Sequence, residues 1–141
     1  MRKNLRKDAH FIIENTLREI NPQKAVKEAL FSYSESAYIF AIGKAAWAMA
    51  KAAVDSLGSR ILGGVVITKY EHSMGEIEGL CIFEGGHPLP DENGARASEY
   101  ALEFFGSLSA ADNIIFLISG GGSALFECPE DGVSLADIEG I

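Results

Sequence analysis

The run from Ser119 to Ser123 places two serines around Gly120, Gly121 and Gly122, directly after an apolar segment. Glycines let the backbone approach a ligand and take positive φ, so that successive N–H groups can converge on one point. The two hydroxyl groups add further donors. Because the run matches neither the Walker A motif nor GxGxxG, two interpretations stay open: a site for a phosphate-like anion, and a flexible Gly-Ser turn.

Two lysines follow other apolar segments at comparable positions, Lys44 in a Gly43-Lys44 pair and Lys69 further along the chain. We predict that Lys44 lies in the first turn of a helix, where the positive end of the helix dipole is unfavourable for a lysine. A lysine so placed can reach a transferring phosphoryl group and neutralise its charge. We therefore select Lys44 as a catalytic candidate, and Gly43 and Lys69 as phosphate-binding candidates. The alternative for both lysines is a solvated surface side chain, and it is stronger for Lys69.

His87 lies in the segment Gly86-His87-Pro88-Leu89-Pro90, in which each proline fixes its own φ and restricts the residue before it. This rigidity predicts a defined place for the imidazole, which can act as an acid, a base or a hydrogen-bond donor. The alternative is a histidine that only bonds to the backbone of its own loop. Asp91 is predicted to be the N-cap of the next helix rather than a catalytic carboxylate.

The segments around these candidates alternate between helical and strand patterns. Apolar residues at helical spacing, followed by the N-cap signal Asn21-Pro22, predict a helical hairpin at the N-terminus. Short apolar runs rich in β-forming residues predict buried strands. The predicted helices cover 5–20, 22–30, 44–57 and 91–105, the predicted strands cover 37–42, 61–68, 80–83 and 113–118, and 133–141 reads as the start of another helix.

Strands that are apolar on both faces and alternate with helices predict an α/β fold. We expect a Rossmann-like, mainly parallel sheet with helices on both faces, preceded by the N-terminal helical hairpin. Ligands of such sheets bind at the carboxyl ends of the strands. All the candidate residues above follow predicted strands, so the sequence predicts one site at this edge.

Composition limits the classes of function. The 141 residues carry a net charge of −8, and Arg96 is the only lysine or arginine after Tyr70. A clustered basic face for nucleic acid is therefore not expected. Cys81 and Cys128 lack metal-ligand spacing and are expected to be reduced thiols. With no signal sequence and no apolar run long enough to cross a bilayer, we expect a cytoplasmic protein without a membrane partner.

Four segments in this order, 41–46, 65–70, 86–92 and 117–124, resemble the glycerate 2-kinase family that carries a C-terminal MOFRL domain. The resemblance implies transfer of phosphate from ATP, with Mg²⁺, to the 2-hydroxyl of glycerate, in a cleft between a Rossmann-like domain and a smaller domain. It also implies that Lys44 is the main catalytic lysine and that His87 and the Ser119–Ser123 turn line the cleft. Glu71 departs from the pattern, because the family usually has glycine there.

Members of this family are considerably longer and use an arginine that would lie beyond Ile141. We therefore expect residues 1–141 to be an incomplete N-terminal domain, without the MOFRL domain and with little activity alone. The metal ligands stay unassigned. Two alternatives remain: a hydroxypyruvate reductase, which the absence of GxGxxG disfavours, and a non-catalytic module whose 5–20 helix docks onto a partner or forms a homodimer.

Overall fold

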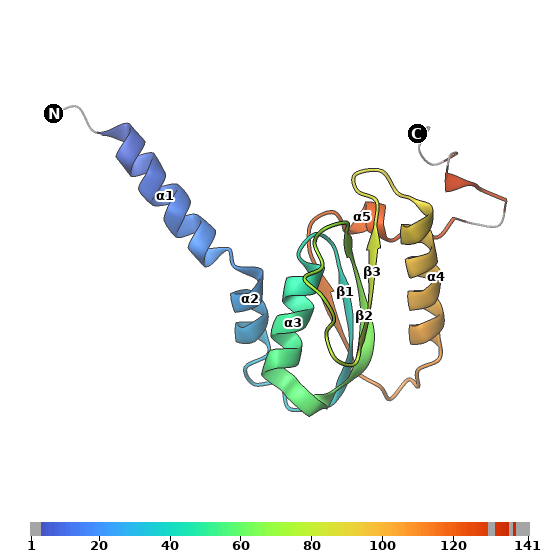
Figure 1. Ribbon diagram of the computed structural model, residues 1–141. Coiled ribbons are helices and arrows are strands. Elements are labelled where there is room, and N and C mark those ends of the chain that lie inside the picture. The colour runs from blue at the N-terminus through green and yellow to red at the C-terminus, as the bar shows by residue number, and fades with distance from the viewer. Residues whose placement is uncertain (1–3, 130–131, 136, 138–141) are drawn as a thin grey trace.

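The computed structural model describes residues 4–129, 132–135 and 137, and the centre of this part is a four-stranded parallel sheet (Figure 1). The strands lie in the order β3-β2-β1-β4. Their bounds are β1 (Ala37–Ile42), β2 (Ile61–Lys69), β3 (Leu80–Gly85) and β4 (Ile114–Ile118). Because every pairing is parallel, all four carboxyl ends lie at one edge. The predicted parallel α/β fold is confirmed.

Helices cover both faces of the sheet, as predicted (Figure 1). On one face α3 (Ala46–Leu57) packs against β1 and β2, with α2 (Pro22–Ala29) on its outer side. On the other face α4 (Glu92–Gly106) packs against β2 and β3. A 3-10 turn (Gly58–Arg60) connects α3 to β2, and the short helix α5 (Gly122–Leu125) follows β4.

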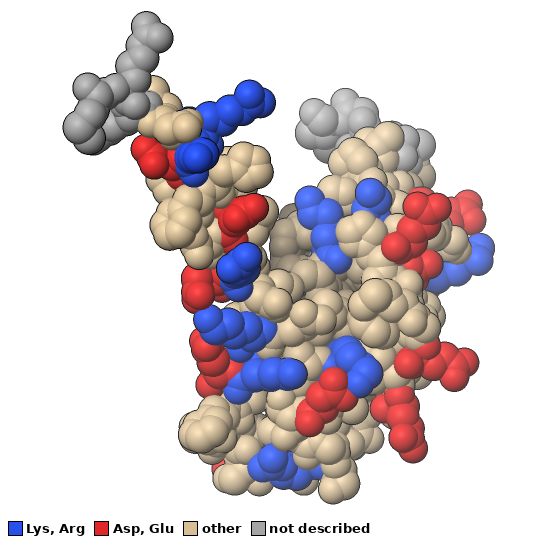
Figure 2. All heavy atoms as spheres, turned by 60° about the vertical axis from the view of Figure 1, so that its left-hand side comes forward, with Lys and Arg blue, Asp and Glu red and all other residues tan. Residues whose placement is uncertain are grey.

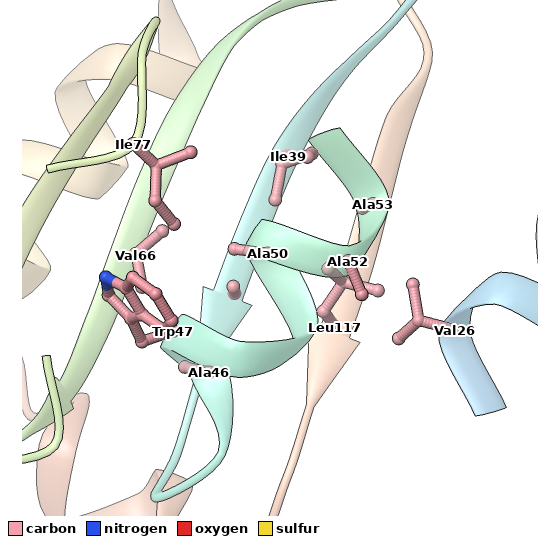
Figure 3. Close-up of a cluster of buried hydrophobic side chains, with 11 residues drawn as sticks. Val26, Ile39, Ala46, Trp47, Ala50, Ala52, Ala53, Val66, Ile77 and Leu117 are labelled. Atoms are coloured by element: carbon pink, nitrogen blue, oxygen red, sulfur yellow. The ribbon is translucent and has the colours of Figure 1, made fainter. Parts of the chain in front are cut away.

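The core under α3 fixes the position of that helix against the strands (Figure 3). Ile39 and Val66 from the sheet are fully buried against the small side chains of α3, and Val26 of α2 closes the outer side. Alanines allow this close approach, because they bury no long side chain. Trp47 lies at the carboxyl-end side of the cluster, and its indole N–H donates to the Gly75 carbonyl at 2.7 Å. The helix that follows Lys44 is therefore rigidly seated.

Both predicted N-terminal helices are present, but they do not pack as a pair. Asn21 caps α2 as expected, because its side chain accepts the amides of Gln23 and Lys24. In contrast, α1 (Leu5–Glu19) has no buried residue and extends away from the sheet (Figure 1). Figure 2 shows it as a column apart from the body, with basic and acidic atoms interspersed. Its apolar side chains, together with Ile20 after it, are 57–74% exposed: Leu5, Phe11, Ile12, Ile13, Leu17 and Ile20.

Several predicted boundaries differ from the structure by one or two residues. The helix predicted from residue 44 begins at Ala46. The strands predicted to end at 68 and 83 extend to Lys69 and Gly85, because these two residues pair with each other in the sheet. The helix predicted to start within 133–141 lies largely outside the described residues.

Candidate functional site

Two turns that are far apart in the sequence form one unit at the carboxyl ends of β1 and β4. The two strands pair in parallel, with Ile42 opposite Ile118. The Ser119 amide donates to the Ile42 carbonyl at 2.9 Å, and the Lys44 amide donates to the Gly120 carbonyl at 3.0 Å. The sheet therefore brings the Gly43-Lys44 pair and the Ser119–Ser123 turn together.

The Ser119 hydroxyl forms hydrogen bonds between the two turns. It accepts the Ala45 amide at 3.0 Å and lies 3.3 Å from the Ile42 carbonyl, to which it can donate. The Ser123 side chain is exposed and has no hydrogen-bond partner among the described residues. Ser119 thus joins the two turns, and the binding of a ligand by either serine stays a prediction.

Lys44 lies in the turn before α3 and not in the first helical turn, where the sequence placed it. Gly43 has φ +111°, and the Ala46 amide bonds to its carbonyl at 3.1 Å, so the regular helix can begin only afterwards. The expected repulsion from the helix dipole is correspondingly weaker, because the effect falls off outside the end turns. The Lys44 side chain is exposed and makes no hydrogen bond or ion pair within the described part of the chain.

Gly121 is the point where the candidate segments meet. It has φ +89°, in the left-handed region that favours glycine. A Cβ placed there would lie 2.6 Å from Nε2 of His87 and 3.4 Å from Cγ of Lys44. The structure therefore brings Lys44, His87 and the glycine turn together, and leaves no room for a side chain between them.

The turn also offers hydrogen-bond donors. The amides of Gly120, Gly121 and Gly122 donate to no acceptor in the described residues. A left-handed residue flanked by residues with negative φ is typical of the backbone concavities that bind anions. The turn thus has the form of such a concavity, and its binding of an anion stays a prediction.

In the described part of the chain, the Lys69 side chain makes no hydrogen bond or ion pair with this cluster. It is the last residue of β2, is half-buried and pairs with Gly85. Strand alternation places it on the α4 face of the sheet, with Val65 and Ile67. Its role in binding phosphate stays a prediction.

Tyr70 holds both ends of the loop that carries His87. Its amide donates to the Gly85 carbonyl at 3.2 Å, before the loop. Its hydroxyl donates to Oδ2 of Asp91 at 2.5 Å, after the loop. Asp91 is also the helix N-cap that the sequence predicts, because its Oδ1 accepts the Gly94 amide at 2.9 Å.

These hydrogen bonds also set the protonation states of Asp91 and Tyr70. Partial burial alone would raise the pKa of Asp91, but hydrogen bonds from Tyr70 and from nearby amides outweigh it and lower the pKa below its usual value. The hydrogen bond to Asp91 raises the pKa of Tyr70. Asp91 accepts as a carboxylate, and Tyr70 donates as a neutral phenol. The bond therefore persists at neutral pH and is lost only when strong acid protonates Asp91 or strong base deprotonates Tyr70.

Two residues that the sequence did not single out support the Gly43-Lys44 turn. The buried Thr68 hydroxyl donates to the Gly43 carbonyl at 3.0 Å. Nδ1 of His72 donates to the Lys44 carbonyl at 2.8 Å. A polar residue at the end of an apolar strand is a signal that could have indicated Thr68, whereas the sequence holds no comparable signal for His72.

Glu71, the departure from the family pattern, has φ +64°. The left-handed region costs a residue with a Cβ about 1 to 2 kcal/mol. We expect Glu71→Gly to raise the free energy of unfolding by about 0.5 to 1 kcal/mol, because the entropy of glycine in the unfolded chain offsets part of the gain. Urea-induced unfolding of the two proteins measures this difference.

Glu76→Gly is the matched control for Glu71→Gly. Glu76 is an exposed residue of the same loop, and its φ is not positive. We expect this replacement to lower stability slightly, because glycine then only adds entropy to the unfolded chain. Equal losses of stability in both variants would contradict the proposed strain at Glu71.

A pocket of about 430 Å³ lies beside the glycine turn. Phe40, Ile118 and Phe126 give it apolar walls, and residues of the turn complete it. Its volume is in the range of small-molecule sites. Two hollows of about 700 Å³ lie elsewhere, along α2 and α3 and beside the loop before β3. We favour the smaller pocket because it adjoins the unpaired amides.

No helix in the described part of the chain is both long and apolar enough to cross a membrane. No group of three or more His, Cys, Asp or Glu side chains gathers there as a set of metal ligands.

Comparison with known proteins gives matches over nearly the whole chain. Residues 8–141 match the family described as "Domain of unknown function (DUF4147)". The D-glycerate 2-kinase of Thermotoga maritima is 46% identical over 138 residues, which are 97% of this chain and 33% of that protein. A putative hydroxypyruvate reductase of Agrobacterium vitis is 41% identical over 102 residues, which are 70% of this chain and 26% of that protein.

Among solved structures, the crystal structure of a glycerate kinase from Thermotoga maritima superposes with a TM-score of 0.86 at 46% identity. The match covers 96% of this chain and 33% of that one. The chain thus spans about one third of the length of these kinases.

Proposed function

Because this chain belongs to the glycerate 2-kinase family, through the domain described as DUF4147, we propose that the polypeptide containing it is a kinase for glycerate. The proposed reaction transfers a phosphoryl group from ATP to the 2-hydroxyl of glycerate and releases ADP. The observation that supports it most is that both the Lys44 side chain and the His87 imidazole lie close to Gly121. The Lys44 side chain, the His87 imidazole and a turn with unpaired amides thus lie close together.

Each part of this cluster has a role in the proposal. The unpaired amides of the turn bind phosphoryl oxygens, as backbone concavities do. Lys44 neutralises the charge that spreads over the transferring group, which is the main contribution a protein makes to phosphoryl transfer. His87 donates a hydrogen bond to the same group or to the glycerate oxygen beside it. Gly43 shapes the turn, and Lys69 adds positive potential from the end of β2.

The residues present fit the phosphates of ATP better than they fit its metal ion. The glycine turn, Lys44 and the adjoining pocket supply donors, a cation and space. When bound with ATP, Mg²⁺ would supply neutralisation of the negative charge on the phosphates. The described residues contain no group of three or more His, Cys, Asp or Glu side chains that could hold the ion, and we assign no residue of this chain to it.

The proposal also covers the domain organisation, the partners and the compartment of the enzyme. We propose that residues 1–141 form the Rossmann-like N-terminal domain and that a second, MOFRL-type domain closes the cleft, since the related kinases are about three times as long. The exposed apolar residues of α1, and Phe116 and Ile118 on the edge strand β4, offer surfaces for such packing or for a homodimer. We propose a cytoplasmic enzyme with a small hydroxy acid as its partner, without nucleic acid or membrane.

A coupled assay of ADP release on the full polypeptide that the gene encodes tests this function. We expect ADP release that requires ATP, Mg²⁺ and glycerate together. The second candidate is reduction of hydroxypyruvate, which the name of the Agrobacterium vitis relative suggests for that protein. Oxidation of NADH with hydroxypyruvate, without ADP release from ATP and glycerate, would overturn the kinase proposal in favour of the reductase.

A further inference from the structure

Tyr70 and Asp91 form a contact that bridges the whole His87 loop. The Tyr70 hydroxyl lies 2.5 Å from Oδ2 of Asp91, and the Asn93 side-chain amide donates to the same hydroxyl at 2.7 Å. The Tyr70 amide bonds to Gly85 on the other side of the loop. Tyr70, which directly follows β2, is therefore bonded to the residues on both sides of the segment 86–90.

Asp91 makes more contacts than helix capping requires. An N-cap needs one acceptor oxygen, and Oδ1 fills that role with the Gly94 amide. Oδ2 is left for Tyr70. In addition, a Cβ at Gly86 would lie 3.1 Å from Cγ of Asp91, so the start of the loop packs directly on this carboxylate. The charged acceptor makes the bond to Tyr70 stronger than a neutral one would be.

The loop held in this way presents His87 to the glycine turn. The segment itself is short, and its two prolines limit how it can bend. Its histidine lies against Gly121, with Nε2 2.6 Å from the position of a Cβ there. A shift of the loop by an ångström would therefore change the distance between the imidazole and the anion-binding amides, and such shifts are costly in catalysis.

We propose that Tyr70 and Asp91 are positioning residues that hold the His87 imidazole at the glycine turn. In this proposal neither side chain contacts the substrate. Both act through the loop, and the inference rests on the proposed function for its kinetic consequence. The placement of His87 itself does not depend on which reaction the enzyme catalyses.

A double-mutant cycle on the full polypeptide tests the kinetic consequence. We expect Tyr70→Phe, which removes only the hydroxyl, to lower kcat/KM for glycerate phosphorylation about tenfold, the effect of losing one hydrogen bond to a charged group. In a His87→Ala background the same change should have almost no further effect, because it acts through His87. A tenfold loss in both backgrounds would overturn the proposal, since general damage does not depend on His87.

Two further variants separate positioning from stability. Asp91→Ser retains a capping oxygen for Gly94 but cannot reach Tyr70, so it should reproduce the loss seen in Tyr70→Phe. Tyr100→Phe is the matched control, because its hydroxyl contacts Cys81 and lies outside the His87 loop. We expect it to leave kcat/KM unchanged. An unaffected kcat/KM in Asp91→Ser would count against the role of the carboxylate.

An NMR measurement on the histidine side chains gives a readout that needs no turnover. The His87 signals, identified by their absence in His87→Gln, should shift or broaden in Tyr70→Phe and stay unchanged in Tyr100→Phe. If they respond but the wild type releases no ADP, the positioning stands and the kinase proposal fails. If ADP is released but neither the signals nor kcat/KM respond to Tyr70→Phe, the positioning fails and the kinase proposal stands.

Discussion

Lys44→Ala is expected to lower kcat for ADP release at least about 100-fold and to leave the free energy of unfolding nearly unchanged. The activity falls because the Lys44 side chain lies along the glycine turn, with its Cγ 3.4 Å from the position of a Cβ at Gly121, and carries the charge that neutralises the phosphoryl group. Stability is retained because the Lys44 side chain is exposed and makes no hydrogen bond or ion pair in the described residues. Steady-state ADP release and urea unfolding of the same preparation measure both effects.

The control for Lys44→Ala is Lys51→Ala, seven residues along on α3, whose ammonium pairs with Asp55 on the helix surface. Loss of an exposed pair costs little, and no effect on turnover is expected. Lys44→Arg should restore part of the rate, because the charge is kept while its geometry changes. Undiminished turnover in Lys44→Ala would exclude the catalytic role and leave Lys44 as a solvated surface residue.

The elements of the fold could be predicted because their signals are local. Apolar runs marked the four strands of the described sheet, and the Asn21 and Asp91 caps marked two helix starts, all within a few residues. The helix start at Ala46 was missed for a physical reason. It depends on the bonds from Lys44 and Ala45 to the Ser119–Ser123 turn, which follows another strand, and these bonds hold the first residues after Gly43 out of helical conformation.

The candidate site could be predicted in part, for a related reason. A parallel sheet gathers every residue that follows a strand at one edge, so Lys44, His87 and the glycine turn were expected to be near one another. Which of them touch depends on the strand order, which places β4 beside β1. The link between Tyr70 and Asp91 depends on the path of a loop, and each residue alone has an ordinary local explanation. Contacts of this kind leave no periodic signal in the sequence.

Gly43→Ala is expected to be the most destabilising single replacement in the site, with a loss of about 3 kcal/mol in the free energy of unfolding. Gly43 has φ +111°, where a residue with a Cβ is strained. The new Cβ would also lie 2.5 Å from the carbonyl oxygen and 2.8 Å from the carbonyl carbon of Ser119. The obstacle is backbone, which cannot rotate away as a side chain can. The loss can be measured by urea unfolding.

The control Gly106→Ala shows whether the loss of stability is specific to position 43 or follows from replacing any glycine. Gly106 ends α4, its φ is not positive, and a Cβ there would meet nothing within 4 Å. Alanine should therefore leave stability unchanged or raise it by up to about 1 kcal/mol, since it favours helix. If Gly43→Ala were as stable as Gly106→Ala, the two turns could not be in contact as described. Lys44 would then lose the bond to Gly120 that fixes its backbone beside the glycine turn.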